Sequence, residues 1–345
     1  MSTAVDHPGS APPAGEPRSK QPVGERSAQP VARARLRASV FGIDVHSEIP
    51  LSFLEGARAA ATGRTLEVSA WPQRELETPW PQSSELICNE LDLDGNVFFR
   101  IEAHPDLGYR VWGPAHGVHL LAADGGQLRC DPNGSRPELW QRLVIAQVLP
   151  FAALLQGLEV FHASAVALDG GAVALLGTSG AGKTSVALEL CYLGGRFLAD
   201  DVVALEIRDE RLLAHPGTQL AGLDHAEARR LEAAGRPRAE TVLASDGRER
   251  LLRMDGASRP VPLTALFFLD RRPDGPEHPM FEPIEDARWL LSATFNFVLG
   301  TSDRLRGLLD VCALAARCRA ERIVASASAD ATQLATAIER RMSQP

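Results

Sequence analysis

The sequence predicts an α/β nucleotide-binding domain that follows a β-rich N-terminal domain. The stretch GTSGAGKT, residues 177–184, has the spacing of a phosphate-binding loop and stands between an apolar run and a helix-forming run. Apolar runs on either side of Asp169-Gly170-Gly171 indicate a β-hairpin whose second arm leads into this loop. Short strand-like segments separated by Gly, Pro and Asp turns occupy residues 37–135, which places a β-rich part before the loop.

The composition of the chain limits the classes of protein and of partner. Its 345 residues, 45% of them hydrophobic, suffice for a sizeable core and for two domains. A formal net charge of -8 and a pI near 5.7 argue against nucleic acid or an acidic membrane as a general partner. We expect a cytoplasmic protein, because no apolar run reaches the length of a membrane span and the first residues lack a signal-peptide core. The five cysteines never fall in a Cys-x-x-Cys spacing, so we expect reduced thiols and no zinc site.

The N-terminal half divides into three predicted segments. Residues 1–36 are rich in Pro, Ala, Gly, Ser and Arg and lack apolar periodicity, which predicts a disordered tail. Residues 37–135 form the β-rich domain, with strand-like segments such as RTLEVSAWP and NVFFRIEA. Residues 136–157 have apolar residues at helical spacing, which predicts a linking helix opened by Pro137 and broken around Pro150.

The second half, residues 158–345, is the predicted ATP-binding catalytic domain. Its apolar runs and breakers indicate strands and helices in alternation, with no internal repeat. The predicted elements are the hairpin arms at 160–168 and 172–176, a helix over 184–193, strands within 196–215, a helix around 224–235, a strand at 263–270, helices over 287–298 and 302–319, a strand at 321–328 and a closing helix over 331–341.

The phosphate-loop motif carries the chemistry of the second half. Glycines let backbone N–H groups face phosphate oxygens, and the following helix N-terminus favours negative charge. Lys183 is one of only two lysines in the chain, the other being Lys20, and all other Lys or Arg positions are arginine. This indicates that position 183 needs an ammonium group and cannot use a guanidinium. We expect Lys183 to contact the β- and γ-phosphates and the Thr184 hydroxyl to bind Mg²⁺. The predicted nucleotide-binding residues are Gly177, Thr178, Ser179, Gly180, Ala181, Gly182, Lys183, Thr184 and Ser185.

A pair of aspartates, Asp200-Asp201, follows the loop lysine at the end of a predicted strand. One carboxylate can organise Mg²⁺ while the other takes a proton from an attacking hydroxyl, which is the pattern of a kinase. Two alternatives remain open from the residues alone. The pair can simply cap a turn, and Asp270, at the end of ALFFLD, can be the metal-binding aspartate instead.

The segment FHASAVALDGGAVALLGTSGAGKTSVALELCYLGGRFLADDVVAL, residues 161–205, resembles the catalytic domain of the HPr serine kinase/phosphorylase family. That family is similar in core fold to phosphoenolpyruvate carboxykinases, which implies a mixed sheet flanked by helices. The resemblance implies that Asp201 is the general base and that Asp200 is the carboxylate associated with Mg²⁺. It also places Lys183 and His162 beside the phosphates as catalytic residues.

The sequence departs from that family in three places. Ser185 stands where family members that also remove phosphate usually have Glu, so we expect kinase activity without efficient phosphorylase activity. The C-terminal signature loop of the HPr enzyme is not found, and the N-terminal domain does not resemble that of the HPr enzyme. The arrangement is more similar to a branch that phosphorylates the precursors of lasso peptides, which implies a peptide acceptor beside a β-domain with free sheet edges.

These observations favour a kinase that uses Mg²⁺ and ATP to phosphorylate a serine of a peptide or small protein, such as a biosynthetic precursor peptide. A small-molecule kinase and an ATPase switch without an acceptor are the alternatives. The expected partners are ATP and the acceptor, without nucleic acid or membrane, and the sequence leaves a homo-oligomer open.

Overall fold

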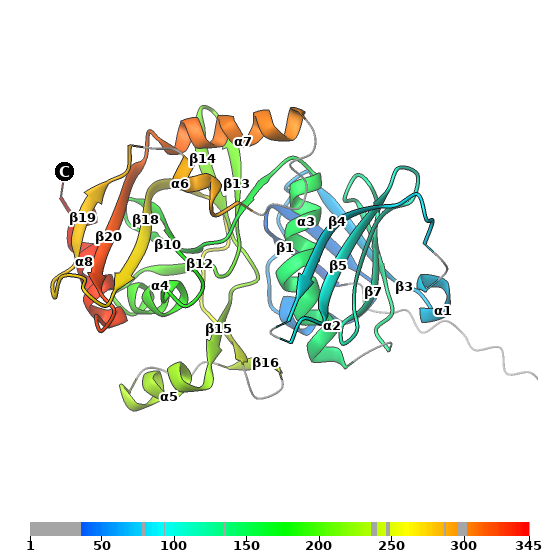
Figure 1. Ribbon diagram of the computed structural model, residues 1–345, viewed down its shortest axis with the longest axis horizontal. Helices are drawn as coiled ribbons and strands as arrows, with labels where there is room; N and C mark the ends of the chain where they lie inside the picture. Colours follow the sequence, from blue (N-terminus) through cyan, green and yellow to red (C-terminus); the bar gives the residue numbers. More distant parts are fainter. Residues whose placement is uncertain are drawn as a thin grey trace, which may run out of the picture. The chain divides into compact units, whose positions relative to one another are not determined.

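Three β-sheets organise the part of the chain that the structure describes (Figure 1). The structure is a computed structural model, and residues 34–345 belong to one compact unit. It describes residues 36–77, 80–92, 94–133, 136–235, 240–245, 249–285, 288–294 and 302–344. The tail predicted for residues 1–36 therefore lies outside the described residues except for Leu36, as do residues 295–298 of a predicted helix.

The first sheet contains eight strands, in the order β1-β2-β3-β8-β7-β6-β5-β4. Its inward residues alternate with partly exposed ones, as in β2, where Ile43 and Val45 are fully buried. The β-rich character predicted for this half is confirmed. The strands are β1 Leu36–Val40, β2 Ile43–Ser47, β3 Thr65–Ala70, β4 Glu85–Leu91, β5 Val97–His104, β6 Gly108–Gly113, β7 Gly117–Leu121 and β8 Gln127–Cys130, with the short helices η1 Ser52–Leu54 and α1 Gln73–Leu76 between them.

The linking helix runs without a break and packs on the first sheet (Figure 1). It consists of α2 Pro137–Leu143, a π-helical turn η2 Val144–Val148 and α3 Leu149–Leu155. The break predicted around Pro150 is wrong. Proline lacks an N–H group and its ring crowds the carbonyl four residues earlier, and the wider π turn just before it accommodates both effects.

The same helix is the one segment of the described chain that is long and apolar enough to cross a membrane. The prediction that no run reaches this length is therefore wrong for Pro137–Leu155. Within the structure 67% of its apolar window is buried, as in a core helix. Phe151, Trp140 and Val148 pack in the core that this helix shares with the first sheet.

The second sheet is mixed and has helices on both faces, which confirms the predicted α/β class. Its main order is β12-β10-β11-β18-β14-β13-β9, and β20 pairs with β18 and β19. Helices α4 and α8 cover one face, and α6 and α7 the other (Figure 1). The strands are β9 Glu159–Phe161, β10 Ser164–Leu168, β11 Gly171–Leu176, β12 Arg196–Ala199, β13 Val203–Arg208, β14 Arg211–His215, β18 Val261–Arg272, β19 Met280–Pro283 and β20 Arg319–Ser326. The helices are α4 Lys183–Tyr192, α6 Arg288–Leu291, α7 Ser302–Ala315 and α8 Ala331–Met342.

The predicted hairpin is confirmed at the centre of this sheet. Strands β10 and β11 pair antiparallel up to Leu168 and Gly171, so Asp169 and Gly170 form a two-residue turn. Every residue of β11 is buried, and β18 runs parallel to it on its other side. The first arm is shorter than predicted, because β9 leaves it at Phe161 to pair with β13.

A small third sheet, in the order β15-β17-β16, stands apart from the second sheet (Figure 1). We call it, with helix α5, the accessory sheet. Its elements are β15 Leu220–Asp224, α5 His225–Ala233, β16 Thr241–Ser245 and β17 Glu249–Arg253. Helix α5 begins at Asp224, whose side chain accepts a bond from Glu227 N, as predicted for a helix in this region. The two following strands, and β19, were not predicted.

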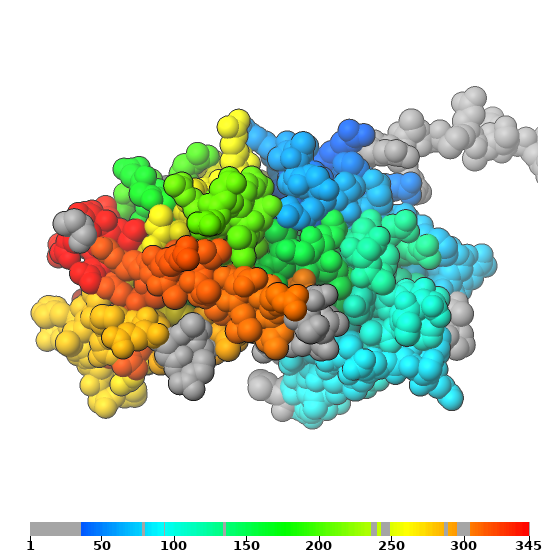
Figure 2. All heavy atoms as spheres, turned by 90° about the horizontal axis from the view of Figure 1, so that it is seen from above, coloured from blue at the N-terminus to red at the C-terminus, as the bar shows by residue number. Residues whose placement is uncertain are grey.

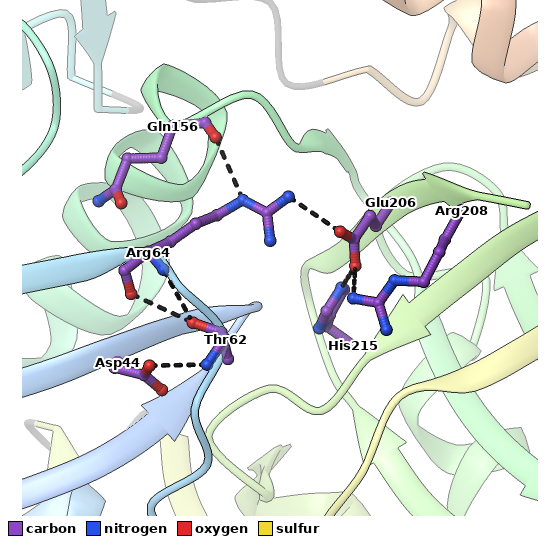
Figure 3. Close-up of polar contacts among 7 residues, drawn as sticks. All are labelled: Asp44, Thr62, Arg64, Gln156, Glu206, Arg208 and His215. Carbon is purple, nitrogen blue, oxygen red and sulfur yellow. Dashed lines mark hydrogen bonds and ion pairs between the residues drawn. The ribbon is translucent and has the colours of Figure 1, made fainter.

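Two of the sets of contacts that join the first sheet and the linking helix to the second sheet involve Arg304 and Arg64. Helix α7, seen in orange along the surface in Figure 2, carries Arg304, which donates to the carbonyls of Leu154 and Leu158. On another side Arg64 donates to Glu206 Oε1 at 2.9 Å and to the carbonyl of Gln156 at 3.3 Å (Figure 3).

Glu206 is the centre of the second set of contacts. Its Oε2 accepts from the buried ring of His215 at 2.9 Å and from Arg208 at 2.6 Å (Figure 3). Withdrawal from water raises the pKa of Glu206, but the hydrogen bonds from Arg64 and His215 outweigh it, so the pKa lies below its usual value. The charged carboxylate of Glu206 therefore stabilises the contact between the first and second sheets at neutral pH.

We predict that Glu206→Ala lowers the free energy of unfolding by about 3 kcal/mol, because it leaves Arg64 and His215 without their shared acceptor. Since the pKa is lowered in the folded state, this loss is complete at neutral pH and shrinks as the pH falls below about 4. Arg208→Ala is the matched control, because the exposed Arg208 side chain contributes less than about 0.5 kcal/mol. Urea unfolding at pH 7 and pH 3 measures both. Equal losses in the two variants would contradict the prediction.

Candidate functional site

The phosphate loop joins β11 to helix α4, as predicted. Gly177, Gly180 and Gly182 have φ angles of 142°, 78° and 89°, which side-chain-bearing residues rarely adopt. A Cβ at Gly177 would lie 2.9 Å from the carbonyl oxygen of Leu269, so glycine is required there for space as well. Residues 178–180 at the tip of the loop are exposed, and α4 begins at Lys183. The loop therefore presents backbone N–H groups and a helix N-terminus to an anion.

The side chain of Lys183 lies back over this loop. Its Nζ donates to the carbonyls of Gly177 at 3.0 Å and Thr178 at 3.2 Å. Burial lowers the pKa of Lys183, while the charges of Asp201 and Asp200 oppose that effect. The ammonium is thus held between the loop and the aspartate pair.

The carboxylate of Asp200 accepts three hydrogen bonds within the site. Its Oδ1 accepts from the hydroxyls of Ser164 at 2.5 Å and Thr184 at 2.8 Å, and its Oδ2 accepts from Gly222 N at 3.0 Å. Burial and the nearby Asp201 charge raise the pKa of Asp200 to about 6, although these three bonds act to lower it. The structure brings Asp200 to Thr184, the residue that the motif assigns to Mg²⁺.

Asp201 occupies a strained position beside it. The bond from Val202 N to Asp200 O, at 2.7 Å, closes a three-residue turn with Asp201 at its centre and a φ of 61°. Positive φ is uncommon outside glycine, and such strain occurs at functional sites. The Asp201 side chain is 48% exposed, and its Oδ2 accepts from Arg142 at 2.8 Å. The alternative that the pair forms a turn and the expectation of a reactive carboxylate are thus both compatible with the geometry.

His162 and Asp270 differ in how they relate to this pair. The exposed ring of His162 has its Nδ1 3.3 Å from the carbonyl oxygen of Asp201, so the histidine adjoins the aspartates through the backbone. Asp270 also borders the site, but its carboxylate accepts from Arg272 and Arg322. These arginines lower the pKa of Asp270, with the Arg272 hydrogen bond as the largest cause. No hydrogen bond in the described part of the chain joins Asp270 to the loop. Thr184 is hydrogen-bonded to Asp200 instead.

A cavity of about 950 Å³ opens in front of the loop. This volume lies at the upper end of the range for small-molecule sites, which suits a nucleotide together with part of an acceptor. Arg271 lines the cavity beside Gly182 and is held by the carbonyls of Ala327 and Ala329. The walls facing the loop include Arg142, Gln147, His162, Asp201, Arg271 and Trp289.

The donor set fits Mg²⁺ bound together with a nucleoside triphosphate. Hydroxyl and carboxylate oxygens from Thr184 and Asp200 lie within 2.8 Å of each other at the start of the helix. Mg²⁺ prefers oxygen ligands and takes one or two from the protein and the rest from phosphates and water. The described residues contain no group of three or more His, Cys, Asp or Glu that could hold a metal ion.

Sequence reasoning missed the residues that come from distant segments. Arg142 of the linking helix and Glu249 of the accessory sheet meet next to Asp201, and nothing in either local pattern marks them. The pKa of Glu227 in α5 is lowered chiefly by the hydrogen bond from Arg230 and to a smaller extent by Ser185, so the position after Thr184 also lies near a carboxylate.

We predict that Asp200→Asn makes the metal-free protein more stable relative to wild type as the pH rises from about 4 to about 6. A raised pKa means that the wild-type carboxyl group stabilises the fold below its unfolded pKa and loses that contribution as the pH passes the folded value. Asparagine keeps three hydrogen bonds by donating to the two hydroxyls and accepting from Gly222 N. The relative gain is on the order of 2 kcal/mol.

Urea unfolding in chelator at pH 4, 5 and 6 measures this difference. Asp169→Asn, in the exposed hairpin turn, is the control and should show no such change with pH. A stability difference for Asp200→Asn that stays flat over this range would refute the assignment.

Comparison with known proteins adds a partial match. No protein-family model matches the chain. The HPr kinase/phosphorylase of Prosthecochloris aestuarii is 42% identical over 67 residues, and that of Chlorobium phaeobacteroides is 40% identical over 64 residues. Each match spans 19% of this chain and 19% of the relative. The solved structure of the Hpr(Ser) kinase/phosphatase from Coxiella burnetii covers 53% of this chain and 93% of its own, at 12% identity and a TM-score of 0.28, a value too low to support the fold. Over about a fifth of its length this chain is similar to HPr kinase/phosphorylases, which confirms the resemblance predicted from its sequence.

Proposed function

We propose that this chain is a kinase that uses Mg²⁺ and ATP to phosphorylate a serine hydroxyl of a peptide or small protein. The observation that carries the proposal is the contact of Thr184 with Asp200 behind the phosphate loop, with Asp201 facing the same cavity. Phosphoryl transfer needs a phosphate cradle, a metal position and a base next to one another, and these residues supply all three.

Each residue has a defined task in this proposal. The loop N–H groups and Lys183 bind the phosphates, and Thr184 and Asp200 would hold Mg²⁺, which when bound neutralises charge on the phosphates. Asp201 accepts the proton of the acceptor hydroxyl. The hydroxyl oxygen then forms a bond to the γ-phosphorus while the bond between that phosphorus and the ADP oxygen breaks. His162 and Arg271 border the phosphates and add hydrogen bonds or positive charge there.

A peptide acceptor is supported by a free edge of the first sheet. Strand β4 is an edge of the first sheet, and its side chains include the exposed Leu86 and Leu91. An extended peptide can add to such an edge through main-chain hydrogen bonds. A biosynthetic precursor peptide is the acceptor that we propose.

We predict that Asp201→Asn lowers phosphoryl transfer by about 10²- to 10⁴-fold while ATP still binds, because only the proton acceptor is lost. Lys183→Ala should lose both transfer and tight ATP binding, since it removes the cation on the phosphates. The measurement uses ATP labelled at the γ-phosphate, Mg²⁺ and a soluble extract of the source organism. The products are separated by size, and nucleotide binding is measured separately.

Asp169→Asn is the matched control, because it makes the same chemical change in the exposed turn at the opposite end of the hairpin. Wild-type transfer by Asp201→Asn would sink the assignment of the base. Label found only in small molecules would show that the acceptor is a small molecule and not a peptide or protein. Release of free phosphate alone would favour an ATPase switch.

A further inference from the structure

A chain of two ion pairs connects the proposed base to the accessory sheet. Arg142 Nη2 donates to Asp201 Oδ2 at 2.8 Å and to Glu249 Oε1 at 3.2 Å, and Arg142 Nε donates to Glu249 Oε2 at 2.8 Å. The guanidinium thus makes a two-pronged contact with Glu249 and uses the same outer nitrogen to hold Asp201. A planar fork of this kind fixes direction as well as distance.

The arginine is held from behind by its own helix. Neighbouring Gln141 is buried, and its side-chain oxygen accepts from Ser52 N at 3.0 Å and Ser52 Oγ at 2.8 Å. Trp140 is buried in the core shared with the first sheet. Because Trp140 and Gln141 are both held in place, the helix backbone that carries Arg142 is fixed. Arg142 projects from it to the cavity.

The helix changes its winding at this point. The π turn Val144–Val148 begins two residues after Arg142, and it contributes Ala146 and Gln147 to the wall of the cavity. Gln147 Oε1 is buried without a hydrogen-bond partner among the described residues. π turns inside helices are frequent at functional sites, and an unsatisfied buried group needs a reason. Both features indicate that this helix face serves the cavity.

The partner carboxylate is held just as firmly. Glu249 begins β17, which pairs with β15 in a register that places Glu249 opposite Asp224. Gly222 of β15 donates its N–H to Asp200 and packs against the Glu249 side chain. The same pair of strands therefore contacts Asp200 directly and Asp201 through Arg142.

The balance of charge keeps Arg142 in place. Burial acts to lower the pKa of Arg142, but the charges of Glu249 and Asp201 raise it further, so the guanidinium stays charged. The Arg142 side chain is only 22% exposed. Water and salt therefore screen its ion pairs less than they screen ion pairs on the surface. Asp201, at the strained turn, has no other side-chain bond in the part of the chain that the structure describes.

We propose that Arg142 is a positioning residue for the kinase reaction: it holds Oδ2 of Asp201, with Glu249 as its support, and leaves Oδ1 directed to the acceptor hydroxyl. The inference rests on the proposed function. It means that the N-terminal half supplies a part of the reaction centre, through a helix that the phosphate-loop motif does not predict.

The test compares Arg142→Gln and Arg142→Lys in the full-length protein, with γ-labelled ATP, Mg²⁺ and the soluble extract as the source of acceptor. Arg142→Gln should lower kcat by roughly 100-fold, because Asp201 is no longer held in place, and should leave the KM for ATP within about twofold. Arg142→Lys, which keeps the charge but loses the fork, should recover part of the rate. Arg136→Gln is the matched control at the exposed start of the same helix and should keep the wild-type rate.

A double variant separates positioning from general support of the fold. If Arg142 acts through Asp201, then Arg142→Gln adds no further loss in the Asp201→Asn background, whereas a structural role would lower the rate again. Glu249→Gln should cause a smaller loss of kcat than Arg142→Gln, also without a change in the KM for ATP.

The outcomes distinguish this inference from the proposed function. If wild type transfers label and Arg142→Gln does so at the wild-type rate, the inference is overturned and the kinase stands. If the KM for ATP rises as much as kcat falls, or if the losses of the double variant multiply, Arg142 supports the fold or the nucleotide instead. If wild type labels no acceptor at all while binding ATP, the kinase proposal itself fails.

Discussion

The carboxylate of Asp200 is the contact on which the geometry of the candidate site depends. It accepts hydrogen bonds from three separate segments: Ser164 in the first hairpin arm, Thr184 at the start of α4 and Gly222 in the accessory sheet. Burying a carboxylate is unfavourable, as its raised pKa shows, so these donors compensate for lost water. A cation bound at the same oxygens would stabilise the charged form of Asp200 more strongly than these hydrogen bonds do.

Fixing Asp200 also fixes its neighbour. The chain turns within three residues from Asp200 to Val202, and Asp201 at the centre of this turn adopts a positive φ. The two side chains therefore have different environments, one enclosed and hydrogen-bonded, the other half exposed at a cavity. Two carboxylates with different surroundings can perform different tasks, and this separation is what a metal ligand and a base require.

The local parts of the site could be predicted from the sequence, and the long-range parts could not. The loop, the hairpin and the aspartate pair lie within 45 consecutive residues whose glycines, apolar runs and turn residues act over short distances. Arg142 lies 59 residues from Asp201 and 107 from Glu249, and no periodicity relates them. The strands β16 and β17 were missed because their short segments carry little pattern of their own and rely on pairing, β17 with β15 and β16 with β17. Proline normally kinks or breaks a helix. At Pro150 the packing of the whole linking helix in the core keeps the helix continuous.

The sharing of one core explains why a distant arginine can serve the site. Val202 and Ala204, which follow the aspartate pair, are buried in the same apolar cluster as Ile43 and Phe151 of the N-terminal half. Leu220 and Leu251 of the accessory sheet belong to that cluster as well. Close-packed interiors do not deform continuously, so residues anchored in one cluster keep their separations. Arg142, Asp201 and Glu249 each lie next to a residue of this cluster in sequence or along a strand, and their ion pairs therefore form without ordering a flexible loop. A boundary between the halves at residue 158 would divide this core, so the phosphate-loop half depends on the first sheet and the linking helix for the position of its proposed base.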